Sequence, residues 1–173
     1  MISPEISEVH GILEKIQLAK DLYSKFKLPL KSNPEVKILF SEVERLIARS
    51  KRMMAEMGVN DLCRSCEEEE GGSCCGAGIE NRYDVVLLLL NLLAGVILPI
   101  SRYDKNSCFF LGPEGCRLKI RHTLCVNFLC SKIEDNLSLD QLVWLQMVLG
   151  EEMEKSFVLY ETVKNLLLKL TER

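Results

Sequence analysis

Cysteine is the residue type with the most chemical potential in this chain, and its spacing is uneven. All eight cysteines of the 173-residue sequence fall within residues 63–130. The stretch CRSCEEEEGGSCC, residues 63–75, holds four of them beside four consecutive glutamates. Thiolates bind zinc and iron–sulfur clusters, and four complete one tetrahedral zinc site. The candidate metal ligands are therefore Cys63, Cys66, Cys74, Cys75, Cys108, Cys116, Cys125 and Cys130.

The spacing of the first four cysteines suggests how they divide. Cys63 and Cys66 have the C-x-x-C spacing that lets one tight turn present both sulfurs to one ion. Cys74 and Cys75 are adjacent, and neighbouring side chains project in different directions, so they are hard to aim at one ion. We expect one of them to join Cys63 and Cys66 and the other to join the downstream cysteines. Zinc is the main expectation, and the spacing also allows an iron–sulfur cluster.

Other uses of cysteine remain open. The N-terminal sequence MISPEISEVH has no secretory pattern, so the expected compartment is the cytoplasm. Clustered cysteines in a reducing compartment usually bind metal, although intracellular proteins of hyperthermophiles form disulfides. A redox C-x-x-C is disfavoured because no strand–helix–strand pattern surrounds it. His122 is an alternative ligand, but eight cysteines already complete two sites.

Basic residues accompany the cysteines along the sequence. They are Arg64, Arg82, Arg102, Arg117, Lys119, Arg121 and Lys132. The simplest role for them is to offset the negative charge of thiolate-rich metal sites. Capture of an anion or RNA by residues 117–122 is a sharper alternative, but no exposed aromatic residues are interleaved there. The net charge of −3 also argues against broad attraction to nucleic acid.

The cysteine region resembles a known family. The resemblance is carried by Cys63-x-x-Cys66, Gly72-Ser73-Cys74-Cys75, Asp84, Cys108 with Phe109, Phe110 and Leu111, Cys116, Arg121, Cys125 and Cys130. These residues are similar to those of the YkgJ-like cysteine-cluster proteins, described as zinc- or iron-chelating domains. The resemblance implies metal binding, and a similar cluster in flagellin lysine methylases is linked to an iron–sulfur centre. The chain departs from the family at His122, where proline is usual, and at Lys119, where an aromatic residue is common.

The segments on either side of the cysteines have helical patterns. Ser3 and Pro4 form a start signal for a helix that should end near Pro29. Asn33 and Pro34 repeat that signal for a second helix, closed by Gly58. The two helices should pair as an antiparallel hairpin over 1–58. In 137–173, Ser138 and Gln141 form a capping box that opens a long helix, with Gly150 as the expected bend.

The middle of the chain should contain a buried helix and a small hairpin. The apolar run 85–100 has 16 residues, fewer than the roughly 20 that span a membrane. It indicates a central helix, begun at Asn81 and covered on all sides. Gly112 and Pro113 should turn a short hairpin flanked by Cys108 and Cys116. Residues 59–80 and 101–136 have too little apolar periodicity to fold unaided, so metal should organise the segment 59–136 around the central helix.

Together these patterns predict one mostly α-helical domain over 1–173: a hairpin over 1–58, a cysteine-rich segment with a central helix over 59–136, and a long helix over 137–173. The predicted function is binding of zinc or iron in all-cysteine sites, with a structural or chelating role. The alternative is an iron–sulfur protein that supports redox or methyl-transfer chemistry, alone or with a partner. No nucleotide loop or acid–base dyad indicates a catalytic site of its own. The expected partners are the metal ion and a protein partner or second copy bound through the long helices, without membrane or nucleic acid.

Overall fold

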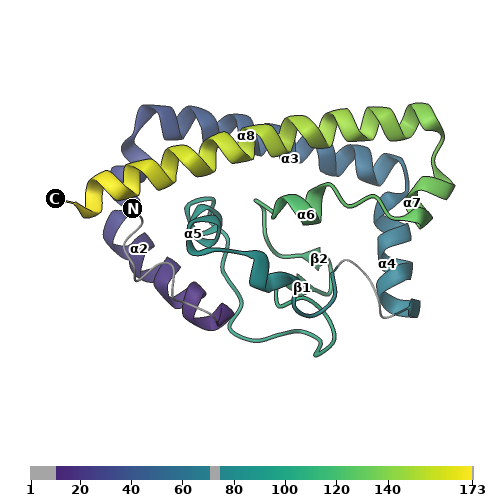
Figure 1. The fold of residues 1–173 in the computed structure, drawn as a ribbon, viewed down its shortest axis with the longest axis horizontal. Helices are drawn as coiled ribbons and strands as arrows, with labels where there is room; N and C mark the ends of the chain where they lie inside the picture. The colour runs from purple at the N-terminus through teal and green to yellow at the C-terminus, as the bar shows by residue number, and fades with distance from the viewer. Residues whose placement is uncertain (1–10, 71–74, 173) are drawn as a thin grey trace.

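The computed structural model describes residues 11–70 and 75–172, and the chain is mostly helical, as predicted (Figure 1). The elements are α2 (Ile12–Ser32), α3 (Pro34–Glu56), α4 (Val59–Glu70), the 3₁₀ turn η1 (Ile79–Arg82), α5 (Val85–Leu93), β1 (Leu111–Gly112), β2 (Gly115–Cys116), α6 (Thr123–Val126), α7 (Ser131–Asn136) and α8 (Leu139–Thr171). No helix in these two ranges combines the length and the apolarity needed to cross a bilayer.

The long helices form a frame with the shorter elements gathered beneath it (Figure 1). The Asn33 side chain caps α3 by accepting a 3.1 Å hydrogen bond from the Val36 amide, as predicted. The Ser138–Gln141 capping box is also present, and α8 continues through Gly150 to Thr171. The main partner of α3 is α8, whereas α2 packs chiefly on α5. The predicted Ser3–Pro4 helix start lies outside the described residues.

Three local expectations were wrong. Pro29 lies inside α2, which continues to Ser32. The helix tolerates this proline because it removes only one backbone hydrogen-bond donor near the helix end. The central helix begins after Asp84, not Asn81, because residues 79–82 form a separate 3₁₀ turn. It ends at Leu93, and Gly95 then turns the chain at φ 81°. The C-x-x-C pair lies in helix α4 rather than in a tight turn.

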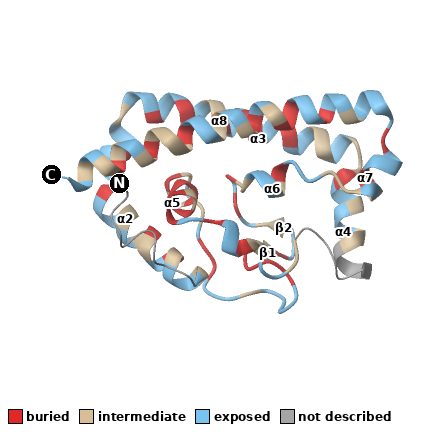
Figure 2. Ribbon diagram, viewed as in Figure 1, coloured by how far each residue is buried: buried red, intermediate tan, exposed pale blue. Residues whose placement is uncertain are grey.

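The buried residues form two clusters (Figure 2). In the larger one, α5 is surrounded by α2, α8 and the segment that contains the β1–β2 hairpin, and Leu88, Leu89 and Leu90 are fully buried. The smaller cluster joins α4, α6, α7 and the first half of α8. α8 also leaves Leu139, Val143, Trp144 and Met147 exposed, so contact of the long helices with a partner stays a prediction.

A buried asparagine ties the central helix to the segment that follows the hairpin. Asn91 is fully buried on α5, among leucines. Its Oδ1 accepts hydrogen bonds from the backbone amides of Lys119 (2.9 Å) and Ile120 (3.1 Å). Its Nδ2 donates to the carbonyls of Ile120 (2.8 Å) and Leu87 (3.0 Å). The side-chain amide is therefore satisfied inside an apolar core, where an unmatched polar group is costly.

Replacing this amide should destabilise the fold strongly. Asn91→Leu keeps a similar volume but leaves the Lys119 amide and both backbone groups of Ile120 without their partner. At about 1–3 kcal/mol for each buried group, the free energy of unfolding should fall by at least about 3 kcal/mol. Urea denaturation measures the loss. Asn165→Leu, at an exposed position of α8, is the control, and a loss below about 1 kcal/mol for Asn91→Leu would contradict the assignment.

Candidate functional site

Four cysteines from separate segments are linked by backbone contact or electrostatic influence, and we call them the downstream group: Cys75, Cys108, Cys116 and Cys125. The Cys108 amide donates a 2.5 Å hydrogen bond to the Cys75 carbonyl, beside a bridge between Gly76 and Ser107. The Tyr83 hydroxyl contacts the Cys125 Sγ at 3.7 Å. Burial, together with the charges of Glu80, Cys116 and Cys125, raises the pKa of Cys108 to about 11. The thiols of Cys108, Cys116 and Cys125 are therefore close enough to interact electrostatically.

The hairpin places Cys116 in this group. β1 and β2 pair antiparallel, with Cys116 opposite Leu111 and Gly112 opposite Gly115. The chain therefore turns at residues 113–114, as the glycine–proline pair predicted. Gly115 has φ 101°, a conformation that residues with a side chain rarely adopt. Cys108 and Cys116 flank this hairpin as expected, and burial raises the pKa of the Cys116 thiol.

Tyr83 and His122 hold Cys125 in place. The Tyr83 hydroxyl accepts a 3.0 Å hydrogen bond from the His122 amide. The Nδ1 of His122 caps α6 by accepting from the Leu124 amide at 3.1 Å. Burial lowers the pKa of His122, with Asp84 opposing and Arg82 adding to the shift. One nitrogen of the alternative metal ligand His122 is thus engaged in holding the helix that carries Cys125.

A buried ion pair supports the loop on the other side of Cys108. The Glu80 carboxylate is 1% exposed and pairs with the Arg102 guanidinium. Glu80 also accepts a 2.8 Å hydrogen bond from the Gly78 amide, while Arg102 donates to the Ser107 carbonyl at 2.5 Å. Burial alone would raise the pKa of Glu80, but the backbone and Arg102 hydrogen bonds lower it below its ordinary value. The pair fixes the residue that precedes Cys108.

The remaining described cysteines lie on α4 and at the start of α7. Cys63 and Cys66 are one helical turn apart on α4, and Cys130 is the N-cap residue of α7. α4 and α7 contact each other, and Cys130 packs on the smaller buried cluster. We call these three residues the α4–α7 group. Cys74 lies outside the described residues, so the expected division of Cys74 and Cys75 between two sites stays a prediction.

A buried arginine lies beside the downstream group. The Arg121 side chain is 12% exposed, and its Nη2 is 3.8 Å from the Glu152 Oε1. Its Nε and Nη2 atoms are buried and have no hydrogen-bond partner within residues 11–70 and 75–172, as far as these are described. Burial raises the pKa of the Cys116 thiol, whereas the positive charges of Arg121 and Lys51 act to lower it. Glu152 itself is 2% exposed and accepts a hydrogen bond from the Ser50 hydroxyl.

Sequence reasoning missed the buried polar residues of this site. Neither Tyr83, Glu80 nor Glu152 was singled out, and Asn91 was regarded only as an interruption of an apolar run. Glu152 lies three residues after the buried Leu149, on the core-facing side of α8. A carboxylate at such a position, like an amide in an apolar helix, signals a buried partner.

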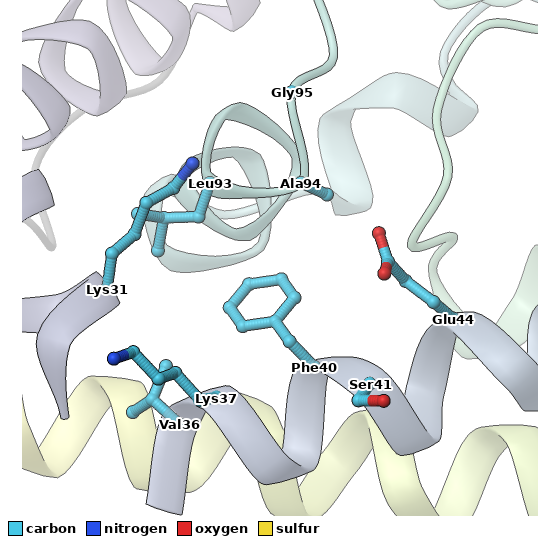
Figure 3. Close-up of a pocket in the computed structure, with 9 residues that line it drawn as sticks. All are labelled: Lys31, Val36, Lys37, Phe40, Ser41, Glu44, Leu93, Ala94 and Gly95. Atoms are coloured by element: carbon cyan, nitrogen blue, oxygen red, sulfur yellow. The ribbon is translucent and has the colours of Figure 1, made fainter. Parts of the chain in front are cut away.

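A pocket of about 440 Å³ lies away from the cysteines, where α3 passes the end of α5 (Figure 3). Phe40 projects into its middle, with Lys31 and Leu93 on one side and Glu44 on the other. The Lys119 ammonium lies 3.7 Å from the Glu44 carboxylate and donates to the Ala94 carbonyl at 2.8 Å. None of the nine residues that line the pocket is a cysteine.

The seven described cysteines form no disulfide with one another. Nor are three or more cysteine, histidine or acidic side chains arranged to enclose an ion in the part of the chain that the structure describes. The downstream group therefore brings several chain segments together, but its sulfur atoms do not enclose a site for an ion.

The Tyr83 hydroxyl should contribute measurably to the stability of this gathering. Tyr83→Phe leaves the His122 amide without an acceptor and removes the contact with Cys125. The free energy of unfolding should fall by about 1–3 kcal/mol, measured by urea denaturation with excess chelator present. Tyr103→Phe, at a side chain that is 62% exposed, should change it little. Equal effects of the two substitutions would show that the buried hydroxyl does not hold the site.

No protein-family model, no curated protein and no solved structure matches this chain.

Proposed function

We propose that this protein binds metal through its cysteines, with zinc as the expected ion and a structural or chelating role. The main support is a chain of contacts between cysteines of separate segments. The Cys108 amide bonds to the Cys75 carbonyl, Cys108 feels the charges of Cys116 and Cys125, and Cys125 contacts the buried Tyr83. Four thiolates from distant segments make a tetrahedral zinc site, and the ion then links loops that have little regular structure. The segment that contains β1 and β2 has little regular structure of this sort, because each strand is only two residues long.

A second site would use the α4–α7 group with Cys74 as its fourth ligand. Residues three apart on a helix share one face, so Cys63 and Cys66 can still address one ion from α4. Cys75 is tied by its carbonyl to Cys108, which favours its membership of the downstream group. Its neighbour Cys74 would then project toward the other site, as its adjacent position suggests.

The residues of the downstream group fit a metal-thiolate centre in charge as well as in type. Four thiolates around a divalent ion leave net negative charge, which must be offset when the site is partly buried. The nearly buried Arg121 guanidinium acts electrostatically on Cys116, and two of its atoms lack an acceptor in the described part of the chain. Because the sulfurs are not closed around a centre, binding would draw these side chains inward.

An iron–sulfur cluster is the second candidate. Cys108 is buried, and Tyr83 and Phe110 pack edge to face with their ring centres 5.0 Å apart beside the group. Such apolar surroundings restrict water and tune the potential of a cluster. Redox or methyl-transfer chemistry would depend on that cluster and on a partner or substrate. Protein purified without oxygen distinguishes the two: a brown colour that bleaches on reduction excludes zinc as the main ion.

Metal content in serine variants tests the proposal. Anaerobically purified wild-type protein should hold two metal centres per chain, measured by elemental analysis and native mass spectrometry. Cys75→Ser and Cys108→Ser should each lose one centre, and Cys63→Ser and Cys130→Ser should each lose the other. Cys74→Ser should behave like Cys63→Ser.

The two groups of variants serve as controls for each other, because each should retain the centre that the other loses. A wild-type protein without stoichiometric metal would refute metal binding. A single centre, or full occupancy in both Cys74→Ser and Cys75→Ser, would refute the two-site arrangement.

A further inference from the structure

We propose that Arg121 is a positioning residue of the downstream group, whose guanidinium donates hydrogen bonds to cysteine sulfur and offsets the negative charge of the bound centre. This inference rests on the proposed metal binding and assigns one residue a specific part in it. Among the basic residues that accompany the cysteines in sequence, it selects Arg121.

The first argument is the unmet hydrogen-bonding capacity of Arg121. Its side chain is nearly buried, yet its Nε and Nη2 atoms have no acceptor among the residues that the structure describes. A buried guanidinium without acceptors is unfavourable, because it loses its hydrogen bonds to water and gains none in return. Native proteins rarely leave such donors unmatched, so we expect an acceptor beyond those that the described residues present in the metal-free chain.

Glu152 alone does not supply that acceptor. Its Oε1 lies 3.8 Å from the Arg121 Nη2, which is an ion-pair distance and too long for a hydrogen bond. The other carboxylate oxygen of Glu152 accepts from the Ser50 hydroxyl. The carboxylate therefore balances the charge of Arg121 while its Nε and Nη2 donors remain available.

The second argument is where Arg121 is held. The backbone of Ile120, just before it, is fixed by Asn91, and the amide of His122, just after it, is fixed by Tyr83. Between these two anchors, the guanidinium acts electrostatically on Cys116. The same Tyr83 hydroxyl contacts Cys125, so one short segment links the arginine to two cysteines of the group.

Other basic residues are engaged elsewhere or exposed. Arg102 pairs with Glu80, and Lys119 bonds to the Ala94 carbonyl near Glu44. Arg64 is on the exposed side of α4 near Asp61, and Arg117 is exposed beside the hairpin. Arg117 is therefore a matched control, since it is an arginine of the same loop without burial.

The test compares zinc affinity in Arg121→Met and Arg117→Met, by competition with a chromogenic chelator on protein that circular dichroism shows to be folded. Loss of a residue that supports metal ligands typically weakens binding 10–100-fold. Arg121→Met should weaken one of the two zinc sites by at least about tenfold and leave the α4–α7 site unchanged. Arg117→Met should leave both unchanged.

Glu152→Gln separates this role from a purely structural one. If Arg121 serves the sulfurs, Glu152→Gln should keep zinc affinity close to that of the wild type, because the arginine remains. If Arg121 only balances Glu152, both substitutions should lower stability and neither should change affinity. Should Arg121→Met fail to fold, Arg121→Met/Glu152→Met removes both buried charges and should show the same weakened site.

The outcomes for the two proposals are distinct. A wild-type protein that binds no zinc or other metal refutes the proposed function, and the role of Arg121 with it. A wild type with two zinc sites, and a folded Arg121→Met or double variant with unchanged affinity, overturns the role of Arg121 alone.

Discussion

The hydrogen bonds between Asn91 and residues 119–120 are the constraint on which the rest of the site depends. They attach a segment without regular structure to the most buried helix of the molecule. A hairpin with strands of two residues cannot hold its own position in water. The amide therefore fixes the end of the hairpin, and with it the direction in which Arg121 and α6 leave the core.

Tyr83 completes this arrangement from the N-terminal side of α5. Its hydroxyl accepts from His122 and contacts Cys125, while its ring packs against Phe110. Both anchors are single polar groups matched inside an apolar environment, where hydrogen bonds are strong and replacements are penalised. The segment of residues 119–122 and the neighbouring Cys125 are thus held by buried polar contacts from both ends of α5.

Short-range signals predicted the frame well. The Asn33 and Ser138 caps depend on contacts within three residues, and the turn at Gly112–Pro113 is similarly local. The errors arose where two local signals competed. Asn81 and Asp84 are both good caps, and the 3₁₀ turn decided in favour of Asp84. Pro29 was expected to stop α2, but packing of Phe26 and Leu30 in the core carries the helix past it.

The candidate site was predictable by residue type but not by arrangement. The cysteines were evident from their clustering, whereas the contact of Cys125 with Tyr83 joins residues far apart in sequence. The burial of Arg121, among the seven basic residues, also depends on a residue far away in sequence. Its guanidinium forms an ion pair with Glu152 on α8. Such pairings follow from tertiary packing, and no local pattern encodes them.

The claim that metal is held by cysteine sulfur alone is tested most directly by X-ray absorption spectroscopy at the metal edge of anaerobically purified protein. For zinc, the account predicts a first shell of four sulfur atoms at about 2.3 Å. A first shell that contains nitrogen or oxygen in place of sulfur, or a protein without bound metal, would contradict it.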